Sequence, residues 1–243
     1  MKSSKKVTFF LFLALGILSS NAYGEIIQVD SDFDGKLDQW HEMSEDGKLI
    51  KIEYDTNGDG KLDQVDIFEG NKKPVLAKLD RNFDGVLDQF QFYSKNFSLE
   101  RIEKDSRFNG KVDRKEFFGS NQKISRIEID ENLDGTMDIF QFFDKQEVLV
   151  RVEYDTNKNN KIDRWEYFAG EENLQSAAFD SNGDGKQDQW QYFKGSTTPE
   201  KVEYDINLDG EVDRWEYFEP SGQLMRVELD RNYDGITDMV KRR

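Results

Sequence analysis

Nine acidic loops hold the residues of this sequence that could bind a metal ion. Each begins with Asp and follows the pattern D-x-N-x-D-G-x-x-D with few exceptions. In the copy Asp55–Asp63, positions 1, 3 and 5 are Asp55, Asn57 and Asp59, whose side-chain oxygens can point into a tight loop. Lys61 at position 7 would offer its backbone carbonyl, and Gly60 at position 6 permits the sharp bend. Calcium binds six to eight hard oxygen ligands in a flexible cage, so the pattern predicts calcium loops.

Position 9 is Asp in all nine copies and is predicted to close the cage. In EF-hand loops the main closing ligand is instead a bidentate Glu at position 12. Here position 12 is acidic only in alternate copies, where it is Asp66, Glu116, Glu166 or Glu216. We therefore assign closure to position 9, with Glu216 as an additional ligand in the fullest loop, which starts at Asp205.

The loops are not equal in their ligands. The first has carboxylates at positions 1, 3, 5 and 9, whereas Asn159 and Asn160 replace Asp and Gly in the loop that starts at Asp155. The loop that starts at Asp105 has Arg107 and Asn109 in ligand positions, and we predict that it does not bind calcium. The predicted metal ligands of the other eight loops are Asp30, Asp32, Asp34, Asp38, Asp55, Asn57, Asp59, Asp63, Asp80, Asn82, Asp84, Asp88, Asp130, Asn132, Asp134, Asp138, Asp155, Asn157, Asn159, Asp163, Asp180, Asn182, Asp184, Asp188, Asp205, Asn207, Asp209, Asp213, Glu216, Asp230, Asn232, Asp234 and Asp238.

The loops recur at a constant spacing of 25 residues, from Asp30 to Asp230. A single loop of this composition is equally explained as a polar turn, because Asn, Asp and Gly are turn residues. Nine copies in one register favour a metal-binding repeat instead. The array leaves no room for a second domain, so residues 25–243 are expected to form one repeat domain.

The segments that flank each loop alternate between apolar and polar residues. In Arg151–Tyr154 and Arg164–Phe168, aliphatic and aromatic residues alternate with Arg and Glu, as in half-buried strands. We expect the outward Arg and Glu side chains to pair across neighbouring strands. Each unit is thus predicted to be a β-hairpin closed by its acidic loop. An EF-hand fold is excluded by length, because only 13 residues separate consecutive 12-residue loops, too few for two helices.

The identity of position 12 alternates with a period of 50 residues, or four predicted strands. An all-β, elongated twisted ribbon of nine hairpins is our prediction for the fold. A small propeller with four-stranded, 50-residue blades is the alternative. Nine hairpins would make four and a half blades, which favours the ribbon.

The first 24 residues have the layout of a secretory signal peptide. Three lysines precede a 12-residue apolar run, and Ala22–Gly24 forms a small-x-small end that predicts cleavage before Glu25. An uncleaved anchor is the alternative, although the apolar run is too short to span a bilayer as a helix. Cleavage would leave no transmembrane segment, and it would place the protein in the periplasm, at the cell surface or in the medium. The chain has no Cys and thus no disulfide to stabilise it there.

Without residues 1–24, the chain has 31 basic and 50 acidic residues, a net charge of −19. This charge excludes nucleic acid as an expected partner and favours cations. Eight calcium ions would supply a charge of +16, so binding is expected to couple to folding. The expected dissociation constants are about 10⁻⁴ to 10⁻³ M, the range of extracellular modules. Magnesium fits less well, because it requires a rigid octahedron.

The D-x-[DN]-x-D-G-x-x-D loop resembles the calcium loops of thrombospondin type 3 repeats, EF-hands and integrin-type FG-GAP repeats. The resemblance covers nine residues in every 25 and implies ligand roles at positions 1, 3, 5 and 9. It does not extend to the folds, because FG-GAP blades are roughly twice as long. Unlike thrombospondin repeats, this chain also has predicted strands between its loops and no cysteines.

We expect an exported calcium-binding repeat protein with a structural or binding role and no enzymatic activity. The chain has one His, no Cys nucleophile and no phosphate-binding glycine loop. A calcium-dependent adhesin or lectin-like protein with a glycan or protein ligand is the alternative, and a secreted hydrolase is the weaker one. The aromatic stripe that includes Trp165, Tyr167, Trp190 and Tyr192 is expected to be core, with a sugar-stacking surface as the alternative.

Overall fold

The computed structural model describes residues 24–70, 73–170 and 173–243, and these residues form a single antiparallel sheet without helices. The predicted signal peptide lies outside the described residues, except for Gly24. No membrane-spanning helix is found in the described part of the chain. The strands are β1 (Ile26–Val29), β2 (Gln39–Met43), β3 (Leu49–Tyr54), β4 (Gln64–Ile67), β5 (Leu76–Leu79), β6 (Gln89–Tyr93), β7 (Leu99–Lys104), β8 (Arg114–Phe118), β9 (Ile124–Ile129), β10 (Ile139–Phe143), β11 (Leu149–Tyr154), β12 (Arg164–Phe168), β13 (Leu174–Phe179), β14 (Gln189–Phe193), β15 (Pro199–Tyr204), β16 (Arg214–Phe218), β17 (Leu224–Leu229) and β18 (Met239–Arg242).

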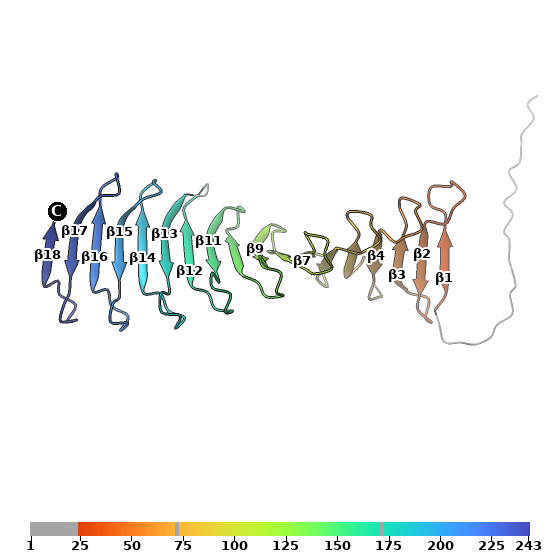
Figure 1. Ribbon diagram of the computed structural model, residues 1–243. Coiled ribbons are helices and arrows are strands. Elements are labelled where there is room, and N and C mark those ends of the chain that lie inside the picture. The colour runs from red at the N-terminus through yellow and green to blue at the C-terminus, as the bar shows by residue number, and fades with distance from the viewer. Residues whose placement is uncertain (1–23, 71–72, 171–172) are drawn as a thin grey trace, which may run out of the picture.

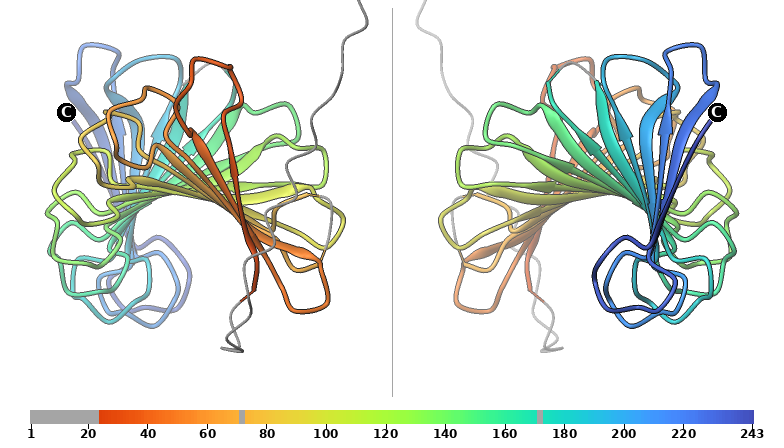
Figure 2. Two further views of the ribbon diagram at one scale, coloured as in Figure 1. Left: turned by 90° about the vertical axis from the view of Figure 1, so that its right-hand side faces the viewer. Right: turned by 90° about the vertical axis from the view of Figure 1, so that its left-hand side faces the viewer.

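Each strand pairs with the strands before and after it in the chain, so the sheet is a meander. β1 and β18 lie at opposite ends of a long ribbon (Figure 1). Viewed along the ribbon, the strands fan out, because each strand is rotated relative to its neighbour by the normal twist of a sheet (Figure 2). The predicted all-β open ribbon of hairpins is therefore confirmed, and the propeller alternative is wrong.

One face of the ribbon, which we name the Trp face, presents positions 11, 13, 22 and 24 of each repeat. In β11 and β12, Trp165 lies opposite Glu153 and Tyr167 lies opposite Arg151. Because the aromatic residues of one strand face the charged residues of the next, this face is a mixed surface rather than an apolar one.

The other face, which we name the Glu face, presents positions 10, 12, 23 and 25. Here Glu166 lies opposite Val152, and Arg164 lies opposite Tyr154. The buried middle row of this face alternates aliphatic residues at position 23 with carboxylates or amides at position 12. Val152 and Glu166, for example, are both buried.

No second layer covers either face of the described sheet, and the aromatic stripe is half-buried rather than enclosed in a core. On the Trp face, arginine side chains cover the rings instead. The guanidinium carbon of Arg151 lies 4.2 Å from the centre of the Phe142 ring, and Arg226 lies 4.0 Å from that of Tyr217. Such contacts bury the long arginine stem and add a cation–π attraction.

Ion pairs on both faces run mostly along a strand, not across strands as the sequence suggested. Arg151 Nε lies 3.0 Å from Glu153 Oε1, two residues further along β11, and Arg214 pairs in the same way with Glu216. Residues two apart point to the same face of a strand, so a long side chain can reach its second neighbour. Cross-strand pairs are fewer; Lys104 and Glu116 form one, at 2.8 Å.

Candidate metal centres

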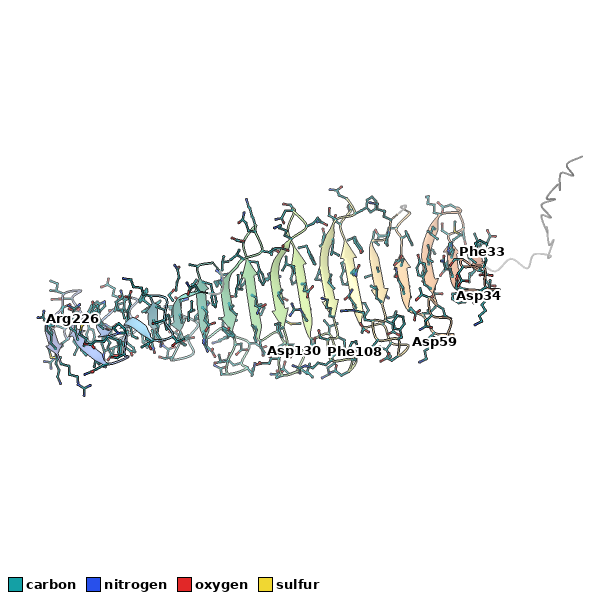
Figure 3. All side chains as sticks on the ribbon, turned by 90° about the horizontal axis from the view of Figure 1, so that it is seen from above. Phe33, Asp34, Asp59, Phe108, Asp130 and Arg226 are labelled. Atoms are coloured by element: carbon teal, nitrogen blue, oxygen red, sulfur yellow. The ribbon has the colours of Figure 1, made fainter. Side chains whose placement is uncertain are left out.

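The acidic loops all lie on one long edge of the ribbon. Each repeat contains two strands, so the chain returns to the same edge every 25 residues, and consecutive loops are spaced by about 10 Å. The labelled loop residues Asp59, Phe108 and Asp130 follow this edge, and Phe33 and Asp34 mark its N-terminal end (Figure 3). The opposite edge carries the short turns.

Backbone hydrogen bonds connect each loop to its own hairpin and to the loop before it. The N–H of Asp63 at position 9 donates to the carbonyl of Tyr54 at 2.8 Å, which closes the hairpin. The N–H of Asp80 at position 1 donates to the carbonyl of Asp63 at 2.8 Å. The corresponding bond is present for every position 1 residue from Asp55 to Asp230, at 3.0 Å or less. Positions 1 and 9 of adjacent loops are thereby fixed side by side.

Aspartates at positions 1 and 9 are among the most deeply buried residues of the described protein. Asp138 has no exposed surface, and Asp130 and Asp213 are each 1% exposed. Position 1 is buried in every repeat from Asp55 onward, and position 9 is buried from Asp63 to Asp213. A buried carboxylate is costly unless hydrogen bonds and a cation compensate it, so this row of buried charge requires explanation.

The position 1 carboxylate organises its own loop by accepting backbone N–H groups. Asp205 Oδ1 accepts from Leu208 at 2.7 Å, and its Oδ2 accepts from Gly210 at 2.8 Å. The N–H of Gly210 is presented by a backbone with φ of 99°, which explains the Gly at position 6. Position 4 is also left-handed, with φ of 65° at Leu208, a feature that the sequence analysis missed.

The position 9 carboxylate ties the start of the loop to its end. Asp213 Oδ2 accepts the N–H groups of Ile206 at 2.8 Å and of Asn207 at 3.1 Å. Where position 2 is Ser or Thr, its hydroxyl can donate to the same carboxylate, as Thr56 Oγ1 does to Asp63 Oδ2 at 2.5 Å. The hydroxyl at position 2 is a further feature that the sequence analysis missed.

Positions 3 and 5 converge within the loop. Asn207 Nδ2 donates to Asp209 Oδ2 at 2.8 Å, and Asn207 Oδ1 accepts the N–H of Asp209 at 3.0 Å. Asp209 Oδ1 accepts from the N–H of Glu211 at 2.9 Å, so the backbone two residues further along the loop fixes the orientation of this carboxylate. Positions 3 and 5 are thus bonded to each other, while positions 1 and 9 are bonded to the loop backbone.

The first loop brings the most negative charge together. One carboxylate oxygen each of Asp30, Asp32 and Asp38 lies within 4.8 Å of the others, the only such group of three acidic residues among the described residues. Asp34 is not part of this group. Six of the other predicted loops have Asp at positions 1, 5 and 9, but among the described residues these three carboxylates do not come together in the same way.

Three carboxylate oxygens at loop positions 1 and 9 are buried without a hydrogen-bond partner. They are Asp30 Oδ1, Asp113 Oδ2 and Asp138 Oδ1. Arg107 Nε lies 4.0 Å from Asp113 Oδ2, so this loop contains its own cation beside the closing carboxylate. This position of Arg107 is in line with the prediction that the loop starting at Asp105 does not bind calcium.

The loop that starts at Asp130 also has a cation nearby, which comes from the next repeat. Lys158 Nζ lies 3.1 Å from Asp138 Oδ2 and 3.5 Å from Glu131 Oε2. Calcium in this loop would have to displace Lys158 from Asp138. The sequence analysis missed this competitor, because it lies outside the 9-residue loop.

Glu216, predicted as an additional ligand, lies in β16 with its carboxylate turned to other partners. Its Oε1 pairs with Arg214, and its Oε2 accepts from the Tyr204 hydroxyl at 3.4 Å. The structure thus places Glu216 in the buried row of the Glu face and not with the oxygens of its loop.

The pKa of Asp88, a position 9 residue, shows that carboxylates of the same and neighbouring loops repel one another. Burial raises the pKa of Asp88 above its usual value, and the charges of Asp80 and Asp105 raise it further, against a backbone N–H bond from Arg81 that lowers it. Asp80 belongs to the same loop and Asp105 to the next. The carboxylates of neighbouring loops therefore repel one another, and a bound cation would reduce this repulsion.

Comparisons with known proteins leave the family open. No protein-family model and no curated protein matches the chain. Two solved structures are similar to most of this chain at low identity: the Photorhabdus luminescens Tc holotoxin pore (12% identity, 80% of this chain, 13% of that chain, TM-score 0.25) and a TcdB2–TccC3 structure (11% identity, 80% of this chain, 14% of that chain, TM-score 0.23). This chain therefore spans about one seventh of theirs, and at these TM-scores neither similarity carries an argument.

Proposed function

We propose that this protein is an exported calcium-binding repeat protein in which calcium stabilises the ribbon. The observation that carries the proposal is the burial of aspartates along the loop edge, where Asp130, Asp138 and Asp213 are the largest fully buried side chains. Backbone N–H groups satisfy part of each carboxylate, but only Asp113 and Asp138 among the described position 9 residues have a basic side chain within 4.0 Å. A row of divalent cations would neutralise that charge.

Calcium suits these loops better than the other common divalent ions. The donors are carboxylate, amide and carbonyl oxygens, which excludes the nitrogen and sulfur ligands that zinc prefers. The side chains at positions 3 and 5, such as Asn207 and Asp209, are exposed, so their oxygens can turn toward a large ion. Calcium tolerates such irregular cages, whereas magnesium requires a near-ideal octahedron.

The role that we propose is structural or binding rather than enzymatic. The position 1 and position 9 carboxylates repeat the same hydrogen-bonded arrangement from loop to loop, which suits a row of similar sites better than one active site. On the Trp face, Arg151 lies over Phe142 and Arg226 over Tyr217, so these rings have a face already occupied. This occupancy favours the structural role over the adhesin or lectin-like alternative, in which sugars would stack on exposed rings.

Calcium titration by calorimetry, with melting temperature measured alongside, tests the proposal. We expect several calcium equivalents, up to about eight, with dissociation constants on the order of 10⁻⁴ to 10⁻³ M. Calcium at about 100 times its dissociation constant should stabilise the fold by roughly 3 kcal/mol per site, so the melting temperature should rise steeply. Magnesium at the same concentration is the control. Absence of both heat and thermal shift at millimolar calcium would refute the proposal.

A further inference from the structure

The two outer strands of the described sheet, β1 and β18, occupy complementary places in the repeat. β1 consists of positions 22–25, and β18 consists of positions 10–13. Inside the ribbon, strands of these two kinds pair across every short turn. β16 and β17 show the pairing, with Arg214 opposite Leu229 and Tyr217 opposite Arg226. The strands at the two ends of the ribbon are therefore of the two kinds that pair across a short turn inside it.

If β18 of one molecule paired with β1 of a second in this same register, the 25-residue period would continue across the junction. Shifting the β16–β17 register by one repeat sets the partners. The pairs would be Met239 with Val29, Val240 with Gln28, Lys241 with Ile27, and Arg242 with Ile26. Backbone groups on the open edge of each strand would gain hydrogen-bond partners, as in other strand-addition complexes.

At both ends of the ribbon, apolar side chains of the kind that is buried in the interior are exposed. Val240 at position 11 is 52% exposed, whereas Val65 at the same position is 7% exposed. Ile27 at position 23 is 42% exposed, whereas Val152 at that position is 3% exposed. Repeat arrays that end in solvent normally replace such residues with polar ones. β18 does so at positions 12 and 13, with Lys241 and Arg242, but Val240 in β18 and Ile26 and Ile27 in β1 remain apolar and exposed.

The terminal loops show the same incompleteness. A position 4 side chain leans toward the preceding loop, as Lys158 does toward Asp138. Phe33, at position 4 of the first loop, is 89% exposed, whereas Phe108 with a preceding loop is 51% exposed. Asp238 closes the last loop and is exposed, although position 9 is buried from Asp63 to Asp213. A head-to-tail junction would place these two loops side by side.

Charge selects the head-to-tail pairing over the symmetric ones. Lys241, Arg242 and Arg243 make the C-terminal edge basic, so two β18 strands would repel each other. β1 itself has no charged residue, and the residue before it is Glu25, so the N-terminal edge does not repel the basic one. Lysine at an edge strand blocks pairing with a like edge, while it permits pairing with an edge that has no basic residue.

We infer that the protein assembles head to tail with copies of itself, β18 of one molecule pairing with β1 of the next. The contact is heterologous and does not close on itself, so repeated docking gives a filament. Each molecule adds 18 strands, or on the order of 85 Å of ribbon, to its length. The inference uses the sheet edges and does not depend on metal binding.

Sedimentation velocity of the purified protein over a range of concentrations tests the assembly, with electron microscopy of the concentrated sample. We expect a concentration-dependent series of linear species with an increment on the order of 85 Å. Ile27→Lys places a lysine opposite Lys241 and should weaken association on the order of tenfold. Val150→Lys is the matched control, because Val150 is an exposed apolar residue in the middle of the ribbon and should leave association unchanged.

A charge exchange tests the register itself. Lys241→Glu combined with Ile27→Lys should restore association, because opposite charges then face each other at the junction. Val240→Glu combined with Ile27→Lys should not, because Val240 lies on the other face of β18. Circular dichroism and melting temperature confirm that each variant is folded.

Three outcomes would overturn the inference. These are a monomer at all concentrations up to the millimolar range, a dimer that grows no further, and association that Ile27→Lys leaves unchanged. A closed dimer would mean that the ends pair with like ends. Indifference to Ile27→Lys would mean that copies meet through another surface.

Discussion

Asp213 combines two roles that can be separated, since it accepts two backbone N–H groups and is predicted to close a calcium cage. Asp213→Asn keeps a hydrogen-bond acceptor but removes the charge. In calcium, we expect this variant to bind one equivalent fewer and to lose about 1–3 kcal/mol of unfolding free energy. In EDTA, it should be no less stable than the parent, because a buried charge has been removed.

Glu211→Gln is the matched control for Asp213→Asn. Glu211 lies at position 7 of the same loop, where only the backbone carbonyl is a predicted ligand, and its side chain is exposed. Calcium stoichiometry and denaturant unfolding should be unchanged. Equal losses in both variants, or a loss by Asp213→Asn that is the same in EDTA, would show that the closing residue acts only through its hydrogen bonds.

At the level of single residues, the sequence predicted the ligand positions of the loop but not its backbone conformation. Positions 1 and 9 were readable because they are always Asp, and positions 3, 5 and 6 because they are nearly always Asn, Asp and Gly. The left-handed backbone at position 4 was not, because Phe33, Phe83 and Leu208 are residue types that rarely adopt it. The position 1 carboxylate accepts the N–H of position 4, and this bond holds the backbone there, for example between Asp80 and Phe83 at 2.7 Å.

At the scale of the strands, arginine–aromatic contacts take the place of a second layer. A double-mutant cycle with Arg151→Met and Phe142→Leu measures one of them, in which the groups lie 4.2 Å apart. We expect a coupling free energy of about 0.5–1 kcal/mol in denaturant unfolding, because the pair is partly desolvated. Additive effects of the two substitutions would mean that the arginine stabilises the sheet only through Glu153.

Half-buried tyrosines on the faces of the sheet should lower the stability of the folded ribbon at high pH. Burial, and then a hydrogen bond donated to Glu166, raise the pKa of Tyr154 from 10.0 to about 12. Burial likewise raises the pKa of Tyr54 and of Tyr192 to about 12. Between these two pH values the unfolded chain loses protons that the folded chain keeps, so unfolding becomes easier as pH rises.

Phenolate absorbance and unfolding free energy, both followed against pH, check this expectation. The folded protein should show a group of tyrosines that ionise near pH 12, and the stability that they contribute should be complete below pH 10 and lost above it. Tyr154→Phe should remove one late-titrating phenol. A single titration centred on the ordinary tyrosine pKa would contradict the prediction.

The strands themselves followed from the sequence, whereas their partners did not. Period-two alternation and the 25-residue spacing predicted the hairpins, because both signals are local. Which side chain covers which depends on the pairing register, which places Arg151 beside Tyr167 on one side and near Phe142 on the other. Ion pairs between residues two apart, such as Arg151 with Glu153, form in preference to cross-strand pairs, because the Arg151 side chain lies over the Phe142 ring.

At the scale of the whole molecule, repeats interact only with their neighbours, so single units should be removable. Residues 105–129 and residues 205–229 are each one repeat in the same phase of the 50-residue alternation. Either deletion joins position 25 to position 1 and preserves the period. We expect both shortened chains to fold, since stability in such arrays is approximately a sum over units and interfaces.

Calcium stoichiometry distinguishes the two deletions. Removal of residues 105–129 takes away the loop in which Arg107 lies beside Asp113, and the number of calcium equivalents should stay the same. Removal of residues 205–229 takes away a full ligand set, and one equivalent should be lost. Calorimetric titration of the two chains measures the difference, and loss of one equivalent from both would show that Arg107 does not prevent binding.

The open meander, in which each strand is held only by the strands next to it in the chain, also determines how the protein would respond to force. The two ends of the chain leave the ribbon at opposite extremities (Figure 1). Tension between them would peel one strand at a time, because no contact among the described residues spans more than adjacent hairpins. Each hairpin would release about 25 residues, or roughly 90 Å of extended chain, before the next one bears the load. The molecule would thus extend in steps of equal length, and a cation that holds the loop of each hairpin closed would raise the force of every step.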